Sequence, residues 1–121
     1  MKPTVLIVED NADLRELITI HFEGAGFQVV SLAHGLDLIS QLRKQEAPPP
    51  QVMILDLMLP GRSGYEMLGT IKSKWPQTRI FVFTSHEEYR NKIPGGLVEG
   101  FFLKTDGIES LVEAVKKQDE K

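Results

Sequence analysis

The sequence predicts an α/β protein in which a doubly wound parallel sheet is covered by helices on both sides. Two observations lead to this prediction. Short runs of apolar residues recur along the chain, and such runs are typical of strands that are buried on both faces. Between them lie longer stretches whose apolar residues repeat with a helical period. Strands and helices in regular alternation, joined by right-handed crossovers, give a parallel sheet between two helical layers.

The first half of the chain contains three predicted strands and two predicted helices. The strands are short apolar runs at about residues 5–8, 27–32 and 52–57. Asn11 can cap a helix over about residues 12–24, because its side-chain oxygen can accept a hydrogen bond from an unpaired N–H group of the first turn. A second helix is expected over about residues 35–44. Three prolines at 48–50 then predict a loop, since proline neither extends a helix nor donates to a sheet.

The second half of the chain continues the alternation. Ser63 is expected to cap a third helix with one apolar face. The elements that follow are a strand at 79–84, a short helix at about 87–92, a strand at 101–103 and a helix that begins near residue 108. Five strands thus alternate with five helices. The run Pro94-Gly95-Gly96 interrupts the fourth helix, so we expect that helix to be short or irregular, and we expect the polar residues 116–121 to fray.

The composition limits both the size of the protein and its partners. With 121 residues, 41% of them hydrophobic, the chain suits one domain with an apolar core, which we expect over residues 1–118, followed by a polar tail at 119–121. A net charge of −3 without a basic cluster argues against direct nucleic-acid binding by this chain. The apolar start is too short to cross a membrane. The absence of cysteine is compatible with the cytoplasm, where we expect the protein.

Four of the predicted strands end in polar side chains with complementary chemistry. These are Glu9 and Asp10 after the first strand, Asp56 in the third, Thr84 in the fourth and Lys104 after the fifth. In a doubly wound fold, functional sites lie at the carboxyl ends of the strands, so we expect these side chains to lie close together. Three neighbouring carboxylates repel one another unless a cation compensates them, and an all-oxygen set of ligands suits Mg²⁺.

A lysine and a hydroxyl group beside these acids indicate an anion as a second ligand. Lys104 could neutralise a phosphoryl oxygen, Thr84 could donate a hydrogen bond to another, and a carboxylate can act as a nucleophile to give an aspartyl-phosphate. Taken singly, an acidic strand end is usually a helix cap and a lysine is usually a surface charge. The prediction depends on all four strand ends being suited to the same reaction.

Four segments, in this order and at these spacings, resemble the receiver domains of bacterial response regulators, a family typified by the chemotaxis response regulator. They are VLIVED at 5–10, LDLMLPG at 55–61 together with Gly64, FTS at 83–85 and GFFLK at 100–104. The resemblance covers nearly the whole chain. It implies a flavodoxin-like sheet with strand order 2-1-3-4-5. It also implies that Asp56 is the phosphoacceptor, and that Glu9, Asp10, Asp56 and the backbone carbonyl of Met58 hold Mg²⁺.

The same resemblance implies how such a protein acts. Lys104 and Thr84 would contact the phosphoryl group, Thr84 would move toward it, and Phe101 would be the aromatic switch residue. The phosphoryl group would come from a sensor histidine kinase or a phosphotransfer protein. Phosphorylation would change a surface of the protein, and an output partner or an effector domain would recognise that change. Members of this family are signalling switches and not enzymes in the ordinary sense, although many take phosphoryl groups from acetyl phosphate and hydrolyse their own aspartyl-phosphate.

The sequence departs from the family pattern in two places. Thr105 follows Lys104 where the family commonly has a proline, and we expect a trans peptide bond there. The segment between Thr84 and Lys104 is about two residues shorter than usual. At family positions that affect the lifetime of the phosphoryl group, Met58 is apolar and is expected to lengthen it, whereas His86 is expected to be a solvated residue at the start of a helix.

Three other functions fit parts of the sequence. A pseudo-receiver would keep the fold only to bind another protein, and the presence of all the key side chains argues against it, although the altered fourth helix means that signalling could be unusual even if phosphorylation works. A flavodoxin-like carrier needs a phosphate loop after the first strand, where the acidic residues 9–13 would repel phosphate. A phosphohydrolase with an aspartate nucleophile needs a second acid soon after it, but residues 57–59 are apolar.

Overall fold

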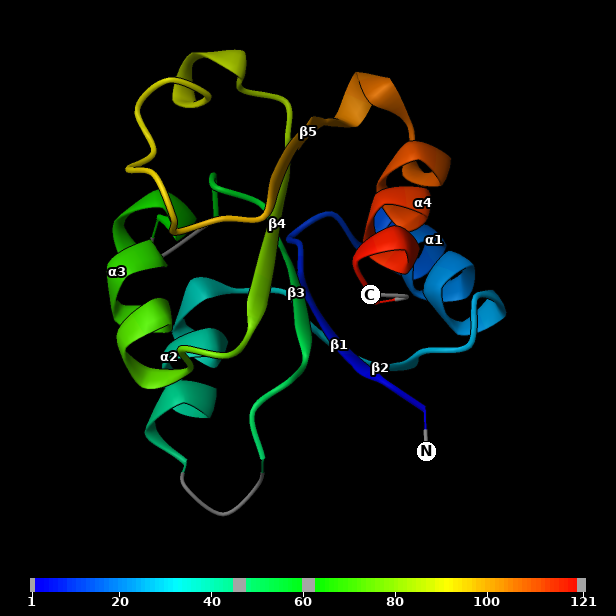
Figure 1. The fold of residues 1–121 in the computed structure, drawn as a ribbon, viewed down its shortest axis with the longest axis horizontal. Helices are drawn as coiled ribbons and strands as arrows, with labels where there is room; N and C mark the ends of the chain where they lie inside the picture. The colour runs from blue at the N-terminus through cyan, green and yellow to red at the C-terminus, as the bar shows by residue number, and fades with distance from the viewer. Residues whose placement is uncertain (1, 45–47, 60–62, 120–121) are drawn as a thin grey trace.

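The core of the protein is a five-stranded parallel sheet, seen in a computed structural model that describes residues 2–44, 48–59 and 63–119 (Figure 1). The strands are β1 (Thr4–Val8), β2 (Gln28–Leu32), β3 (Val52–Leu55), β4 (Arg79–Thr84) and β5 (Gly100–Leu103). They lie in the order β2-β1-β3-β4-β5, and every neighbouring pair is parallel. This confirms both the predicted fold class and the predicted strand order.

Four α-helices of the described residues cover the sheet, and they form two layers, one on each face (Figure 1). They are α1 (Ala12–Gly24), α2 (Gly35–Arg43), α3 (Gly64–Lys74) and α4 (Ile108–Asp119). Helices α1 and α4 cover one face of the sheet, and α2 and α3 cover the other (Figure 1). Because side chains alternate along a strand, Val5 and Ile7 of β1 join the core under α1 and α4, while Leu6 and Val8 join the core under α2 and α3.

Helix α1 begins and ends as its sequence predicts. The Asn11 side chain accepts a hydrogen bond from the backbone N–H of Leu14 at 2.9 Å, which confirms it as the cap. Beyond the last turn, Gly26 has a φ of +95°, a conformation that glycine adopts without steric cost. Leu17 keeps the apolar period of α1, but its side chain is 49% exposed, since the sheet contacts the face that carries Phe22.

Helix α3 begins directly against the end of β3. Ser63 stands at the cap position, but its hydroxyl makes no capping hydrogen bond and donates to the carbonyl of Leu57 at 3.2 Å, so the expected side-chain cap is wrong. The backbone N–H of Gly64 donates to the same carbonyl at 3.0 Å. A Cβ atom on Gly64 would lie 2.5 Å from the backbone oxygen of Asp56, so this close approach requires glycine.

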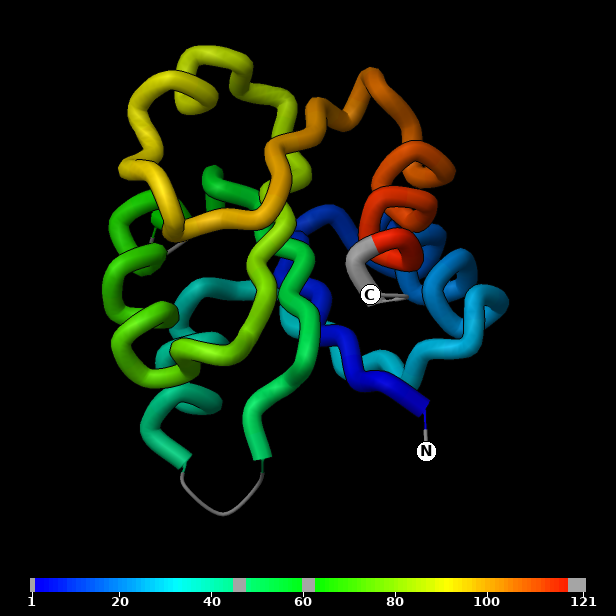
Figure 2. The backbone as a smooth tube through the Cα atoms, in the orientation of Figure 1, coloured from blue at the N-terminus to red at the C-terminus, as the bar shows by residue number. Residues whose placement is uncertain are grey.

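The connection between β4 and β5 contains no α-helix, and it is described throughout. Residues 85–99 form a 3-10 turn at Glu87–Tyr89 and then an irregular loop, the yellow stretch in Figure 2. The expectation of a short or irregular fourth helix is confirmed. The expectation of five helices is wrong, because Pro94 and its two glycines end the segment before an i to i−4 ladder can form.

The C-terminal helix is longer than expected. Helix α4 continues to Asp119, so the fraying expected from residue 116 is wrong as far as residue 119, while residues 120–121 of the expected tail lie outside the described part. The peptide bond between Lys104 and Thr105 is trans, as expected. None of the helices in the described ranges is long and apolar enough to cross a membrane.

Candidate functional site

The predicted site residues lie at the carboxyl ends of the strands, at the upper edge of the sheet in Figure 1. Glu9 directly follows β1, and its N–H extends the ladder to the carbonyl of Leu32 at 3.0 Å. Asp56 directly follows β3, which ends two residues earlier than predicted, and its N–H donates to Val8 at 3.1 Å. The backbone of both acids is therefore fixed by the sheet.

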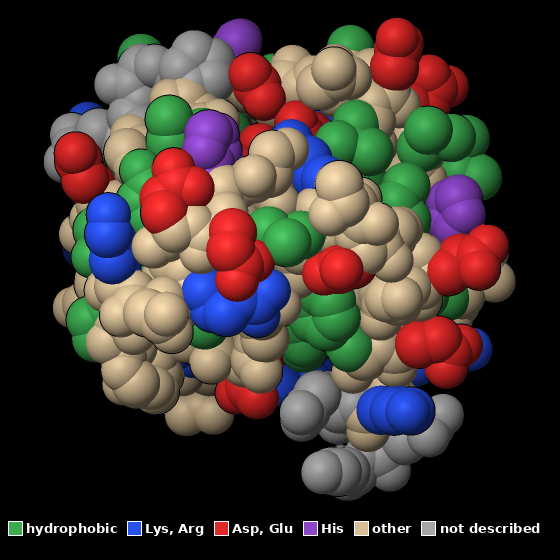
Figure 3. Space-filling view, turned by 90° about the horizontal axis from the view of Figure 1, so that it is seen from above, with side chains coloured by type: hydrophobic (Ala, Val, Ile, Leu, Met, Phe, Trp, Pro, Cys, Tyr) green, Lys and Arg blue, Asp and Glu red, His purple; other side chains and the backbone are tan. Residues whose placement is uncertain are grey.

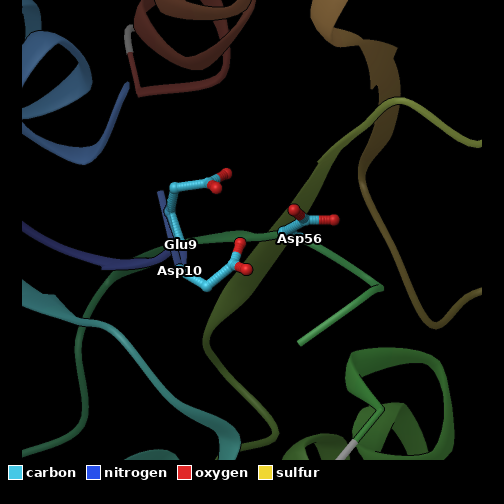
Figure 4. A group of neighbouring side chains, drawn as sticks. All are labelled: Glu9, Asp10 and Asp56. Carbon is cyan, nitrogen blue, oxygen red and sulfur yellow. The ribbon is translucent and has the colours of Figure 1, made fainter. Parts of the chain in front are cut away.

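Three carboxylates meet at this edge. Oxygen atoms of Glu9, Asp10 and Asp56 lie within 4.8 Å of one another, and Figure 4 shows their side chains directed toward a common space. Glu9 and Asp56 are buried, at 2% and 4% exposure, whereas Asp10 is exposed. The site is thus open to solvent on the side of Asp10.

Lys104 bridges the two buried acids. Its Nζ lies 2.8 Å from Oδ2 of Asp56 and 3.0 Å from Oε1 of Glu9. Burial lowers the pKa of the ammonium group, but the hydrogen bonds to Asp56 and Glu9 outweigh this effect and raise the pKa of Lys104. Lys104 therefore carries its charge directly beside the carboxylate expected to react.

Backbone N–H groups complete the hydrogen bonding of the acids. The N–H of Asn11 donates to Oε2 of Glu9 at 3.0 Å, and the N–H of Met58 donates to Oδ1 of Asp56 at 3.1 Å. Burial raises the pKa of Glu9 above its ordinary value, and the hydrogen bonds from Asn11 and Lys104 only partly oppose this shift. Burial thus dominates the pKa of Glu9 although Lys104 lies 3.0 Å from its carboxylate.

The donor set fits a hard divalent cation. Three carboxylates face a single ammonium group among the side chains that contact one another here. Carboxylate oxygens are the ligands that Mg²⁺ prefers, and Mg²⁺ usually binds through one or two carboxylates while keeping several waters. Glu9, Asp10 and Asp56 are therefore the residues that could hold it.

Thr84 and Phe101 occupy neighbouring strands at the side of this cluster. Thr84 is fully buried at the end of β4, and its hydroxyl accepts a hydrogen bond from the N–H of His86 at 3.3 Å. Phe101 is half-buried on β5 and packs against the core under α2 and α3. The Arg90 guanidinium carbon lies 4.6 Å from the centroid of the Phe101 ring, and Glu87 pairs with Arg90 at 2.7 Å.

Sequence reasoning missed the residues that surround the site. Arg15 donates to the backbone carbonyl of Glu9 at 2.9 Å, and the Tyr89 hydroxyl contacts the sulfur of Met58 at 3.4 Å. Arg15 lies one turn into α1, so the helix prediction could have placed it near the site. Nothing in the sequence indicates the position of Tyr89 or Arg90, because both depend on the path of an irregular loop.

The surface around the strand ends is mixed in character. Figure 3, which views the molecule from above, shows acidic and basic side chains close together over the middle of this face, with hydrophobic side chains on both sides of them. No single sign of charge dominates the view, so the acids of the site are a local feature and not part of an extended acidic surface.

Comparison with known proteins gives consistent matches. The family described as "Response regulator receiver domain" matches residues 5–116. Sporulation initiation phosphotransferase F from Bacillus subtilis (strain 168) is 30% identical over 121 residues, which cover 97% of this chain and 94% of that protein. The transcriptional regulatory protein CssR, also from Bacillus subtilis, is 33% identical over 95 residues, 78% of this chain but only 40% of CssR. This chain thus spans less than half the length of that relative.

A solved structure agrees with these relatives. The response regulator protein TrrA from Thermotoga maritima, crystallised in complex with Mg²⁺ and BeF, has a TM-score of 0.83 and 27% sequence identity, covering 97% of this chain and 98% of that one.

Proposed function

Because this chain belongs to the response regulator receiver domain family, we propose that it is a phosphoacceptor switch in which the carboxylate of Asp56 takes the phosphoryl group. The observation that carries this proposal is the buried Asp56 carboxylate, paired with Lys104 at 2.8 Å beside two further acids. Carboxylates buried close together repel one another and destabilise the fold, so such clusters are typical of functional sites.

The proposed reaction is a direct phosphoryl transfer to Asp56. A carboxylate oxygen attacks phosphorus, an O–P bond forms, and the bond from phosphorus to the donor breaks, with its electron pair leaving on the donor. Lys104, now bound to Oδ2 of Asp56, would exchange that contact for one with a phosphoryl oxygen. The buried hydroxyl of Thr84 would donate to another phosphoryl oxygen.

We propose Glu9, Asp10 and Asp56 as Mg²⁺ ligands, with the backbone carbonyl of Met58 as a further one. The separation of the carboxylate oxygens, all within 4.8 Å, supports this assignment, as does the Mg²⁺ complex of TrrA. When bound, the cation would offset the charge of the acids and of the incoming phosphoryl oxygens. Lys104 alone offsets only one of the three carboxylate charges.

The conformational change would begin at Thr84 and would then involve Phe101. As Thr84 moves toward the phosphoryl group, it vacates space near β5, and Phe101 would turn into that space. Such a shift follows only if the phosphoryl group makes better contacts in one state than in the other. The hydrogen bond between Thr84 and His86 supports this role, because it links Thr84 to the loop whose Arg90 lies over the Phe101 ring.

The donor and the output partner follow from the family. We propose that a phosphohistidine on a sensor histidine kinase or phosphotransfer protein supplies the phosphoryl group in the cytoplasm. An effector domain or separate partner would recognise the changed surface, and the similarity to the transcriptional regulator CssR favours an effector domain. The receiver domain would span residues 1–118, with a polar tail at 119–121, and would also catalyse loss of its own phosphoryl group.

Intact-mass spectrometry after incubation with acetyl phosphate tests this function. The experiment compares wild type and Asp56→Asn, each with and without Mg²⁺. We expect a single phosphoryl adduct that requires both Mg²⁺ and Asp56. If no adduct forms and beryllofluoride with Mg²⁺ also fails to bind, a protein-binding module without phosphorylation becomes the better explanation.

A further inference from the structure

Met58 contacts the phosphoacceptor with its backbone and the loop between β4 and β5 with its side chain. Its N–H donates to Oδ1 of Asp56 at 3.1 Å, and its sulfur accepts a hydrogen bond from the Tyr89 hydroxyl at 3.4 Å. The Met58 side chain is 45% exposed, so it lies at the mouth of the site and not in the core. One residue therefore connects the reacting carboxylate to the 3-10 turn.

The Tyr89 ring is held from two sides. Its centroid lies 5.1 Å from that of Tyr65 in the first turn of α3, and 6.3 Å from that of His86, which approaches edge-on. Tyr65 in turn donates its hydroxyl to the backbone carbonyl of Lys92 at 2.9 Å, farther along the same loop. The rings of Tyr65 and His86 therefore fix the Tyr89 ring, whereas the Tyr65 hydroxyl is bonded away from Met58.

This contact restricts a side chain that is otherwise free to move. Methionine is unbranched and has three rotatable bonds, so an exposed methionine samples many rotamers. A thioether is only a weak acceptor, but a single directed hydrogen bond from a fixed hydroxyl favours the rotamers that bring the sulfur to Tyr89. Tyr89 thus selects where the Met58 side chain lies relative to Asp56.

We propose that Tyr89 is a positioning residue that holds the Met58 thioether across the mouth of the site and thereby slows hydrolysis of the aspartyl-phosphate. The inference rests on the proposed function of Asp56. In the hydrolysis, the oxygen of a water attacks phosphorus and the bond from phosphorus to the Asp56 oxygen breaks. Asp56 leaves as a carboxylate with the electron pair, and a proton passes to solvent. An ordered apolar side chain at the entrance limits access of this water.

The test compares Tyr89→Phe with Tyr65→Phe as a matched control. Both variants lose one hydroxyl and keep an aromatic ring, but the Tyr89 hydroxyl donates to the Met58 sulfur and the Tyr65 hydroxyl donates to the carbonyl of Lys92. Each protein is phosphorylated with acetyl phosphate and Mg²⁺, the donor is removed, and the adduct is followed by intact mass. We expect decay to be about threefold faster in Tyr89→Phe, the size of a neutral hydrogen bond at the weak end of its range, and indistinguishable from wild type in Tyr65→Phe.

Repeating Tyr89→Phe in a Met58→Leu background shows whether Tyr89 acts through its hydrogen bond to the Met58 sulfur. Leucine offers no sulfur acceptor, so Tyr89→Phe should no longer change the decay rate there. In parallel, NMR of ¹³C-methyl-methionine protein without any phosphoryl donor should show the Met58 methyl resonance shifted in Tyr89→Phe and unchanged in Tyr65→Phe.

The outcomes distinguish this inference from the function on which it rests. If wild type forms no adduct and does not bind beryllofluoride with Mg²⁺, both fail. If the adduct forms but decays equally in wild type and Tyr89→Phe, or if the Met58 resonance does not move, only the role of Tyr89 is overturned. The role of Tyr89 also fails if Tyr89→Phe changes the rates of formation and decay in proportion, or if its effect persists in the Met58→Leu background.

Discussion

Lys104 and Asp56 meet in a charged hydrogen bond of 2.8 Å although they are 48 residues apart in the chain. They stand at the ends of β5 and β3, which are not neighbours, since β4 lies between them. The ammonium group thus reaches across one strand to the carboxylates at the centre of the sheet. This contact ties together the ends of three strands, and it determines how substitutions at the site act on stability.

Replacing Lys104 with Met should destabilise the protein. The substitution keeps a long side chain but leaves the buried Glu9 and Asp56 carboxylates without their cation. We expect the free energy of unfolding without Mg²⁺ to fall by about 1–3 kcal/mol, less than for a fully buried pair because Lys104 is partly exposed. Urea denaturation measures the change. The exposed Lys74→Met is the control, and an equal loss in both variants would contradict the expectation.

Replacing Asp56 with Asn should affect function and stability differently. It removes one of three neighbouring carboxylates and therefore relieves repulsion with Glu9. We expect the free energy of unfolding without Mg²⁺ to exceed that of wild type or stay within about 1 kcal/mol of it, while Mg²⁺ affinity falls at least about tenfold. Urea denaturation and calorimetric titration report the two quantities. A large loss of stability would indicate that Asp56 mainly supports the fold.

Two glycines of α3 should respond oppositely to alanine. A Cβ atom at Gly64 would lie 2.5 Å from the backbone oxygen of Asp56, whereas a Cβ atom at Gly69 meets nothing within 4 Å. We expect Gly64→Ala to lower the melting temperature and, since α3 must move away from Asp56, to slow phosphorylation. Gly69→Ala should stabilise the helix by about 0.5–1 kcal/mol. Thermal melts of both variants provide the comparison, and equal shifts would show that the contact at Gly64 relaxes without cost.

The stability of the protein should depend on pH through Glu9. Burial raises the pKa of Glu9 in the folded state, so the folded protein retains this proton more readily than the unfolded chain. Without Mg²⁺, the contribution of Glu9 to stability is therefore greatest below the ordinary carboxyl pKa and is lost as the pH rises through the raised value. The cation favours the charged form, so Mg²⁺ should raise the melting temperature more at pH 7.5 than at pH 5. Glu9→Gln should remove most of this difference.

The contact of Arg90 with Phe101 should bias the switch. The guanidinium group lies 4.6 Å from the ring centroid and is fixed by Glu87, so it favours this position of the ring over one turned toward Thr84. We expect Arg90→Gln to tighten beryllofluoride binding about two- to fivefold, the range of an exposed cation–π contact. Titration in the presence of Mg²⁺ measures this. Lys92→Gln, which removes a cation over Tyr89 instead, should leave the affinity unchanged.

The position of the site could be predicted from the sequence because it depends only on where each apolar run ends and on the parallel arrangement of the strands. Glu9, Asp56 and Lys104 each come directly after or near the end of an apolar run, and the parallel arrangement of such runs brings their ends together. The exposure of Leu17 is a related case, because this residue keeps the apolar period of α1. Periodicity gives the apolar positions of a helix, but the neighbouring elements decide which of them are covered.

The contacts of the loop between β4 and β5 do not follow from the sequence in the same way. Its 3-10 turn has no repeating pattern, so the pairing of Tyr89 with Met58 and of Arg90 with Phe101 is set by the path of the chain in space. The hydroxyl of Ser63 is a smaller example, since a cap position in the sequence does not decide between the helix and a nearby carbonyl.

The same loop offers a place to build a sensor. Residues 94–96 are all exposed, and Gly96 has a φ of +87° at the tip. Exposed tips of this kind tolerate the insertion of whole domains. A circularly permuted fluorescent protein inserted here would be attached to the segment that carries Tyr89 and Arg90. Its emission would then report changes at Asp56 in living cells without any substitution at the site itself.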